Sequence, residues 1–271
     1  MRIIIAITCF LSLFQLSCKK EKDAVSLASE VGFAAAQSAT EADAMLTAAL
    51  DLVKDFKNPS NWTVIPSSAK ITYIDSSFSD FTGVSFRIDF GPVRSNKPRG
   101  MLCLDGKYRA GVLECSMRAP YLDSGNRINA HHLNEFYTGN GTEMFLMKGN
   151  INLLRTGQTS WQVNEDLEID ALHLSVMSWK ADLTMNQNNG SHSYLGTSSG
   201  VSSSEGKSYN LTISDPLVKK ENCPNTFIKG ICDISVNSEV IFLDFNPYSD
   251  QVCDEVARTS LNRFEKIFYI H

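Results

Sequence analysis

The sequence lacks three features that would each have pointed to a function. No two cysteines form a Cys-x-x-Cys pair, so the spacing of a zinc or thioredoxin-type site is absent. Lys and Arg total 25 against 30 Asp and Glu, which leaves no overall basic footprint, and we expect no nucleic-acid partner. No apolar run reaches the ~20 residues of a membrane-spanning helix. The 271 residues, 43% of them hydrophobic, are nevertheless enough to form a folded core.

The N-terminus predicts export from the cytoplasm. Arg2 supplies a short positive region, and residues 3–14 form an apolar run of about twelve residues, interrupted only by two hydroxyl side chains. This run is too short to cross a bilayer but fits the hydrophobic part of a signal peptide. We therefore predict a signal peptide over residues 1–17.

The residues that follow predict a lipid anchor. Leu16-Ser17-Cys18 is similar to a bacterial lipobox, in which a small residue precedes the cysteine that receives the lipid. Gln15 departs from that pattern, so cleavage near Ser17 without lipidation stays an alternative. We predict lipidation of Cys18 and a tether over residues 18–23, with the acyl chains as the sole membrane attachment. The expected location is the outer membrane, with the leaflet left open.

Residues 24–58 predict one or two helices. The segment up to Phe56 is rich in Ala, Leu, Glu and Asp and contains no proline, and its apolar residues recur at helical spacing. Thr40 followed by Asp43 is typical of a helix start, with Thr40 as the N-cap. We expect an apolar stripe that docks on the main domain.

Residues 62–271 predict a β domain. Val84, Phe86, Ile88 and Phe90 alternate with polar residues, as in a half-buried strand, and Gly or Asn turn signals recur every 8–14 residues. We predict a mainly β protein with an antiparallel multi-strand meander of about a dozen strands, sandwich-like or barrel-like, preceded by the N-terminal helical segment. No alternation of strands with long helices supports an α/β fold.

Five cysteines remain when the signal peptide is removed and Cys18 carries lipid. An exported compartment permits disulfides, and the odd number leaves at least one thiol outside any intrachain bridge. We predict a Cys223–Cys253 disulfide that clamps the C-terminal strands. Cys115 and Cys232 should both face the core, either as buried thiols or as a cross-core bridge.

Four stretches of the body carry a resemblance to a known family. They are Phe86–Gly91 followed by Cys103–Gly111, Gly206–Ile213 running into Pro216–Lys220, Cys223 with Phe227–Gly230, and Leu243–Phe245 with Cys253-Asp254. Their order resembles a family of uncharacterised Bacteroidetes lipoproteins with β-rich bodies, over about residues 84–270. The resemblance implies a lipid-anchored envelope protein built as a strand meander, and it implies no activity and no catalytic residues. The basic loop at residues 94–99 departs from the family pattern, as do Cys115 and Cys232.

Two groups of residues are candidates for chemistry. His131 and His132 are adjacent, so on a strand they should point to opposite faces and could not ligate one metal together. A weak calcium-loop pattern places oxygen ligands at Asp244, Asn246, Asp250 and Glu255, although the turn glycine is missing and no helices flank it. We therefore predict no metal site and no cofactor.

The aromatic residues Trp62, Trp161, Trp179, Tyr121 and Tyr137 are candidates for stacking on a glycan, or for ordinary core packing. The function we predict is a lipid-anchored cell-envelope protein with a non-enzymatic binding or structural role. Its expected partner is a protein or a glycan. The alternative is an envelope hydrolase or metal-dependent enzyme that uses His131/His132 or the Asp244–Glu255 carboxylates.

Overall fold

The computed structural model describes residues 2–54, 62–76, 83–133, 135–170, 176–204, 206–220, 223 and 226–270, with side chains from residue 19 onward. Within these residues one helix, α1 (Arg2–Lys54), precedes sixteen strands. The strands are β1 (Lys70–Asp75), β2 (Val84–Asp89), β3 (Met101–Leu102), β4 (Tyr108–Ala110), β5 (Val112–Arg118), β6 (Arg127–His132), β7 (Tyr137–Gly139), β8 (Met144–Arg155), β9 (Ser160–Asp170), β10 (Met177–Asn188), β11 (Ser191–Val201), β12 (Ser208–Lys220), β13 (Lys229–Val236), β14 (Glu239–Asp244), β15 (Val256–Leu261) and β16 (Phe264–Tyr269).

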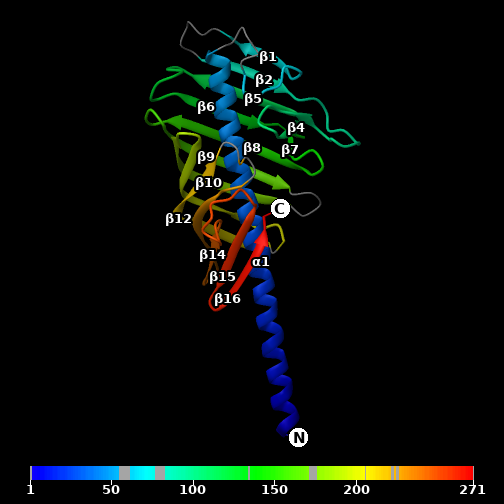
Figure 1. Cartoon of the computed structure of the whole chain (residues 1–271). Helices are drawn as coiled ribbons and strands as arrows, with labels where there is room; N and C mark the ends of the chain where they lie inside the picture. Colours follow the sequence, from blue (N-terminus) through cyan, green and yellow to red (C-terminus); the bar gives the residue numbers. More distant parts are fainter. Residues whose placement is uncertain are drawn as a thin grey trace.

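All the strands belong to one antiparallel sheet. The main path runs β1-β2-β5-β6-β8 and then continues in sequence order from β9 to β16. The three short strands β3, β4 and β7 lie off this path and pair with one another and with β8. Because nearly every strand pairs with the next one in sequence, the sheet grows as a meander along the length of α1 (Figure 1).

Helix α1 lies in the middle of the protein rather than on its surface. From residue 24 onward it carries many small side chains, and ten of its alanines are buried together with Val31, Met45 and Leu46. A helix that is apolar on nearly all sides is stable only where protein surrounds it. Gly32 shows how close the surrounding chain comes, because a Cβ there would lie 3.2 Å from Leu243 Cδ2 and 3.5 Å from Ile270 Cδ1.

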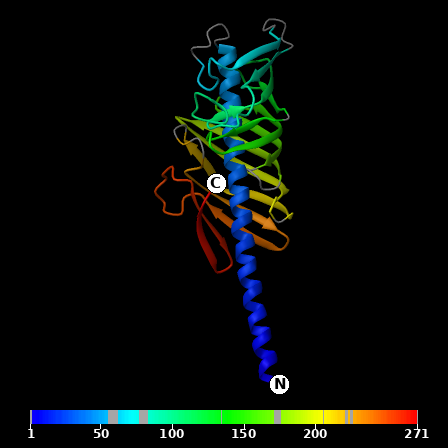
Figure 2. The same ribbon diagram turned by 90° about the vertical axis from the view of Figure 1, so that its right-hand side faces the viewer.

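The sheet curls around this helix. In Figure 2 the first strands lie on one side of α1, whereas the β15–β16 hairpin lies on the other side. The inner face of each long strand supplies alternate apolar residues to the core. In β9 these are Trp161, Val163, Leu167 and Ile169. Helix and sheet therefore share a single core.

The predicted fold class is confirmed, as a mainly β antiparallel meander after an N-terminal helix. The sheet is a single open one rather than a two-sheet sandwich, because α1 provides the second layer that covers its inner face. The helix start predicted at Thr40 is wrong. Thr40 lies inside α1, where its hydroxyl donates to the carbonyl oxygen of Ala36 at 2.7 Å, four residues earlier.

The predicted helical segment, residues 24–58, is helical as far as it is described. Residues 55–61, where the predicted helix end falls, lie outside the described residues, and α1 extends to Lys54. The predicted tether, residues 18–23, continues the helix. No helix among the described residues contains an apolar stretch long enough to span a membrane.

The predicted disulfide between Cys223 and Cys253 is confirmed. Cys223 and Cys253 form a disulfide with their Cα atoms 5.7 Å apart, and the bridge ties the start of the β13–β16 region to the segment before β15. Cys115 and Cys232 are both free and buried, which settles the alternatives in favour of buried thiols over a cross-core bridge. Burial raises the pKa of the Cys115 thiol to about 12, so this side chain stays protonated and behaves as a small apolar residue.

We predict that the disulfide stabilises the native state. The bridge joins residues 30 positions apart, so replacing both cysteines in a Cys223→Ser/Cys253→Ser variant should lower the free energy of unfolding by about 3–4 kcal/mol. Urea unfolding with and without a thiol reductant measures this change. A Cys232→Ala variant is the control and should keep the wild-type sensitivity to reductant. Equal stability of the wild-type protein in both conditions would contradict the prediction.

Candidate functional site

Two acidic residues in the buried part of α1 organise the polar interior. Glu41 and Asp43 are two positions apart, so their side chains leave the helix about 200° apart. Glu41 therefore faces β4 and β7, whereas Asp43 faces β11 and β12. A buried carboxylate is costly unless it is paired. The strands on each side of the helix, here called a wall, must therefore supply partners for the carboxylate that faces them.

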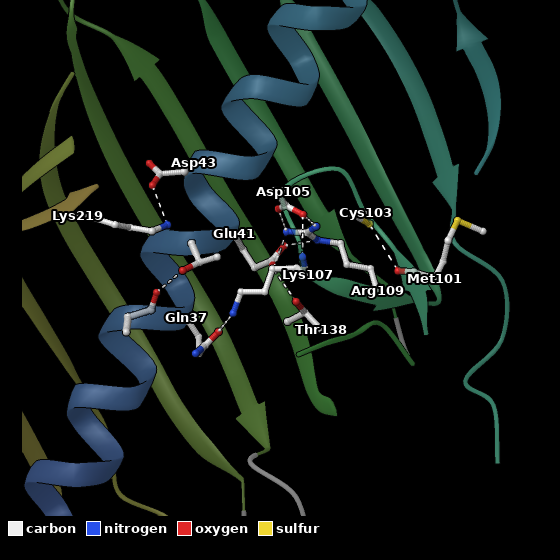
Figure 3. A network of polar contacts seen from close by, with 12 residues as sticks. Gln37, Glu41, Asp43, Met101, Cys103, Asp105, Lys107, Arg109, Thr138 and Lys219 are labelled. Atoms are coloured by element: carbon white, nitrogen blue, oxygen red, sulfur yellow. Dashed lines mark hydrogen bonds and ion pairs between the residues drawn. The ribbon is translucent and has the colours of Figure 1, made fainter. Parts of the chain in front are cut away.

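Glu41 binds Arg109, whose side chain is completely buried. Arg109 Nε lies 3.1 Å from Glu41 Oε2, and Nη2 lies 3.1 Å from Oε1. The same guanidinium holds Asp105 with contacts of 2.9 and 2.8 Å (Figure 3). Thr138, the direct cross-strand neighbour of Arg109, donates its hydroxyl to Glu41 Oε1 at 2.7 Å. Burial opposes the charge of Arg109, but Glu41 and Asp105 outweigh it and raise the pKa well above its ordinary value.

Lys107 adds a second buried cation on the same wall. Its Nζ donates to Gln37 Oε1 of α1 at 3.2 Å. Burial lowers the pKa of Lys107 to about 8, even though the nearby charge of Glu41 favours the protonated form. The helix is thus joined to this wall by an arginine, a lysine and their acceptors.

Asp43 is held on the opposite wall. Lys219 Nζ lies 2.9 Å from Asp43 Oδ2, and His192 Nδ1 lies 2.7 Å from Oδ1, which also accepts from the hydroxyl of Tyr194. Burial alone would raise the pKa of Asp43, but the charge of Lys219 and the hydrogen bonds from His192 and Tyr194 lower it. Asp43 is therefore ionised, and Nδ1 of His192 carries the shared proton.

The strand register explains how these groups meet. His192 of β11 pairs directly with Gln187 of β10 and with Lys219 of β12, so the three form a row across neighbouring strands. Tyr194 lies two residues further along β11 and faces the same side. The helix then places Asp43 over this row.

A pocket of about 430 Å³ opens between α1 and this row, and we take it as the candidate functional site. It is lined by Thr40, Asp43, Ala44 and Thr47 of α1, by Thr63 and Val64, by Asp105, and by Gln187, His192, Lys219 and Lys220 of the strands. Its volume lies within the usual range for small-molecule sites. The side-chain amide nitrogen of Gln187 lies 3.4 Å from His192 Nε2, the ring nitrogen that Asp43 leaves free.

A third buried acid, Glu165, lies outside this pocket. Trp179 Nε1 donates to Glu165 Oε2 at 2.6 Å, as expected for diagonal neighbours on one face of β9 and β10. Glu165 Oε1 has no hydrogen-bond partner among the described residues. Burial raises the pKa of Glu165 to about 7, although the hydrogen bond from Trp179 opposes this shift.

The two histidines named from the sequence do point to opposite faces of β6. His131 is exposed and its Nδ1 lies 2.8 Å from Asn150 Oδ1, whereas His132 is buried and its ring lies 4.8 Å from that of Phe136. Burial lowers the pKa of His132 to about 4, so it is neutral near pH 7. The two rings form no common site.

The carboxylates named for a calcium loop are used within the fold. Asp244 accepts from the backbone N–H of Asn246 at 2.9 Å and from Arg258 at 2.8 Å. The side-chain oxygen of Asn246 accepts from the backbone N–H groups of Asp250 and Gln251, both at 3.1 Å. Across the described residues, no group of three His, Cys, Asp or Glu side chains is arranged to hold a metal ion. This includes the side chains of Asp250 and Glu255.

The aromatic residues serve mainly as core. Trp161 and Trp179 are each 1% exposed and Trp62 is 6% exposed, so these three rings cannot stack on a glycan at the surface. Tyr121 and Tyr137 are partly buried. The three tryptophans therefore form no surface platform for a glycan. A glycan partner stays a prediction.

No local sequence pattern identifies the pocket. Asp105 and Arg109 lie in the stretch Cys103–Gly111 that carries the family resemblance, and Asp43 belongs to the pattern that predicts a helix start. The signal that could have found them is the presence of Gln37, Glu41 and Asp43 inside an alanine-rich helix, because buried polar side chains need partners. Comparisons of the chain with protein-family models, curated proteins and solved structures gave no match, so the family resemblance stays a prediction.

We predict that Glu41→Ala strongly destabilises the protein. The substitution leaves the buried guanidinium of Arg109 with Asp105 alone, so the free energy of unfolding should fall by about 3 kcal/mol. Glu114→Ala is the matched control, since it removes a carboxylate that pairs with Arg87 at the surface and should cost less than about 1 kcal/mol. Urea unfolding measures both, and equal losses would contradict the account of the buried pair.

We predict that Glu165 makes stability depend on pH. Its pKa is about 7 in the folded protein and near 4.5 in the unfolded chain, so stability falls as the pH rises from about 4.5 to 7 and then levels off. The total loss is about 3 kcal/mol. A Glu165→Gln variant should therefore gain stability relative to wild type at pH 8 compared with pH 4.5, as thermal unfolding at the two pH values would measure. A difference between the two proteins that is the same at both pH values would disprove this assignment.

Proposed function

We propose that this chain is a lipid-anchored protein of the cell envelope, located in the outer membrane, whose β body has a binding role rather than a catalytic one. The observation that carries the proposal is the continuity of α1. The helix passes from the predicted lipid position at Cys18 directly into the core, where Ala24 is its first buried residue. Six residues of helix span only about 9 Å, so the lipid would hold the body close to the bilayer.

Contacts near the start of the described side chains support a defined orientation on the membrane. Lys20 Nζ lies 2.7 Å from Glu239 Oε1, next to the turn that joins β13 and β14. Lys207 Nζ lies 3.6 Å from Asp23 Oδ2, at the start of β12. These turns would face the bilayer, whereas β1 and β2 would lie at the far end of the body (Figure 1).

The pocket chemistry favours binding over catalysis. Asp43 and His192 form a pair that resembles the acid–base part of a hydrolase site, but Lys219 also binds Asp43 and competes for its charge. Two of the three pocket threonines are engaged in holding the fold, since Thr40 donates to a backbone carbonyl and Thr63 donates its hydroxyl to Asp51 at 2.8 Å. Covalent catalysis would need a side-chain nucleophile next to the free nitrogen of His192, and among the described lining residues serine and cysteine are absent.

Metabolic labelling tests the anchor. Expression in a bacterial host with radiolabelled palmitate should label the wild-type chain, and Cys18→Ala should abolish the label and release the protein from the membrane fraction. Cys9→Ala is the matched control and should keep the label, because that residue lies inside the predicted signal peptide. Unchanged labelling of Cys18→Ala would disprove lipidation at Cys18.

A further inference from the structure

The pocket between α1 and β10–β12 carries an excess of positive charge at its rim. Inside it, Asp43 and Lys219 neutralise each other. The carboxylates of Asp105 and Glu41 share the charge of Arg109, and the nearby Lys107 supplies the second positive charge. Lys220 also lines the pocket, is exposed, and makes no ion pair among the described residues. Among the described lining residues, the balance at the mouth is therefore one cation without an ion pair, and an anionic group would be the complementary partner.

The inner part of the pocket offers uncharged hydrogen-bonding groups, a ring nitrogen of His192 and a hydroxyl. In the neutral ring whose Nδ1 donates to Asp43, Nε2 is an acceptor, and the described group facing it is the Gln187 amide at the long distance of 3.4 Å. A ligand hydroxyl could donate to this nitrogen with better geometry. Thr47 adds a hydroxyl to the lining from the helix side.

We propose that this pocket binds a small hydroxylated carboxylic acid, the chemistry of an acidic sugar. The ligand carboxylate would lie against Lys220, and a ligand hydroxyl would donate to His192 Nε2. The inference deepens the proposed binding role and rests on it, but it does not depend on the lipid anchor. Asp43 acts here as a positioning residue, because it fixes the protonation of His192 and holds Lys219 in place.

The geometry argues for a rigid site. Gln187, His192 and Lys219 occupy neighbouring strands in direct register, and Asp43 comes from a helix that is buried on nearly all sides. Groups on regular elements hold their positions better than groups on loops. A ligand would therefore meet donors and acceptors that are already in place, which reduces the ordering cost of binding.

The test uses the full chain in mild detergent and saturation-transfer NMR with sodium glucuronate as the probe. We expect binding with a dissociation constant in the millimolar range, because a single exposed charge and a few hydrogen bonds give weak affinity. Methyl glucoside, which keeps hydroxyls but lacks the carboxylate, should bind at least about five-fold more weakly.

Two charge-matched variants locate the binding. Lys220→Gln should weaken glucuronate binding about five-fold, since it removes one charge at contact distance. Lys266→Gln removes a lysine of β16 that is also exposed, and it should leave the affinity unchanged. Thermal unfolding measures whether both variants are folded. We expect that they are, because neither side chain makes an ion pair among the described residues.

Three outcomes would overturn the inference: no saturation transfer from glucuronate, equal binding of glucuronate and methyl glucoside, or equal affinities of Lys220→Gln and Lys266→Gln. Palmitate labelling at Cys18 reports on the anchor separately. A failure at the pocket is therefore distinguishable from a failure of the proposed location.

Discussion

The structure depends on the burial of one helix inside one sheet. A long antiparallel sheet has an apolar inner face that must be kept from water, and in this protein α1 covers it along most of its length. The helix can do so because its small side chains let strands approach from several directions. Alanine and Gly32 at the contact positions allow the sheet to curl until β14 and the end of β16 touch the helix. Among the described residues, neither element has another layer to bury its apolar surface against.

Burying that helix creates the polar interior. Glu41 loses contact with water when the sheet closes around α1, and the Asp43 side chain keeps only 14% of its surface exposed at the pocket, so each must be paired. Glu41 accepts hydrogen bonds from Arg109 and Thr138. Asp43 is paired with Lys219 and hydrogen-bonded to His192 and Tyr194. These contacts connect the helix to strands that are far apart in the sheet, so they help to define how the sheet lies on the helix. The pocket is the place where this arrangement stays open to solvent.

The same helix connects the body to its proposed anchor. A flexible tether would let the body tumble freely above a membrane, whereas a helix that continues into the core transmits the direction of the anchor to the whole domain. The ion pairs of Lys20 and Asp23 with the turns of the sheet lie at this junction. The proposed orientation and the buried helix are therefore two consequences of one structural element.

Much of the architecture could be predicted from local patterns. Alternation in β2 identifies strands, alanine content identifies the helix, and the spacing of Cys223 and Cys253 around the last strands identifies their bridge. These features depend on residues close in sequence or on a few distinctive side chains. The separation of His131 from His132 likewise follows from the two-residue period of a strand.

The tertiary structure decided what local patterns do not encode. Asp43 lies 149 residues from His192 and 176 from Lys219, and Glu41 lies 68 residues from Arg109. Their meeting depends on strand register and on where the helix enters the sheet, which no short segment specifies. The sequence by itself determined the composition of the elements and the predicted export signal. Only the folded sheet, by removing the middle of α1 from water, decided which charges had to be paired and where a pocket could remain.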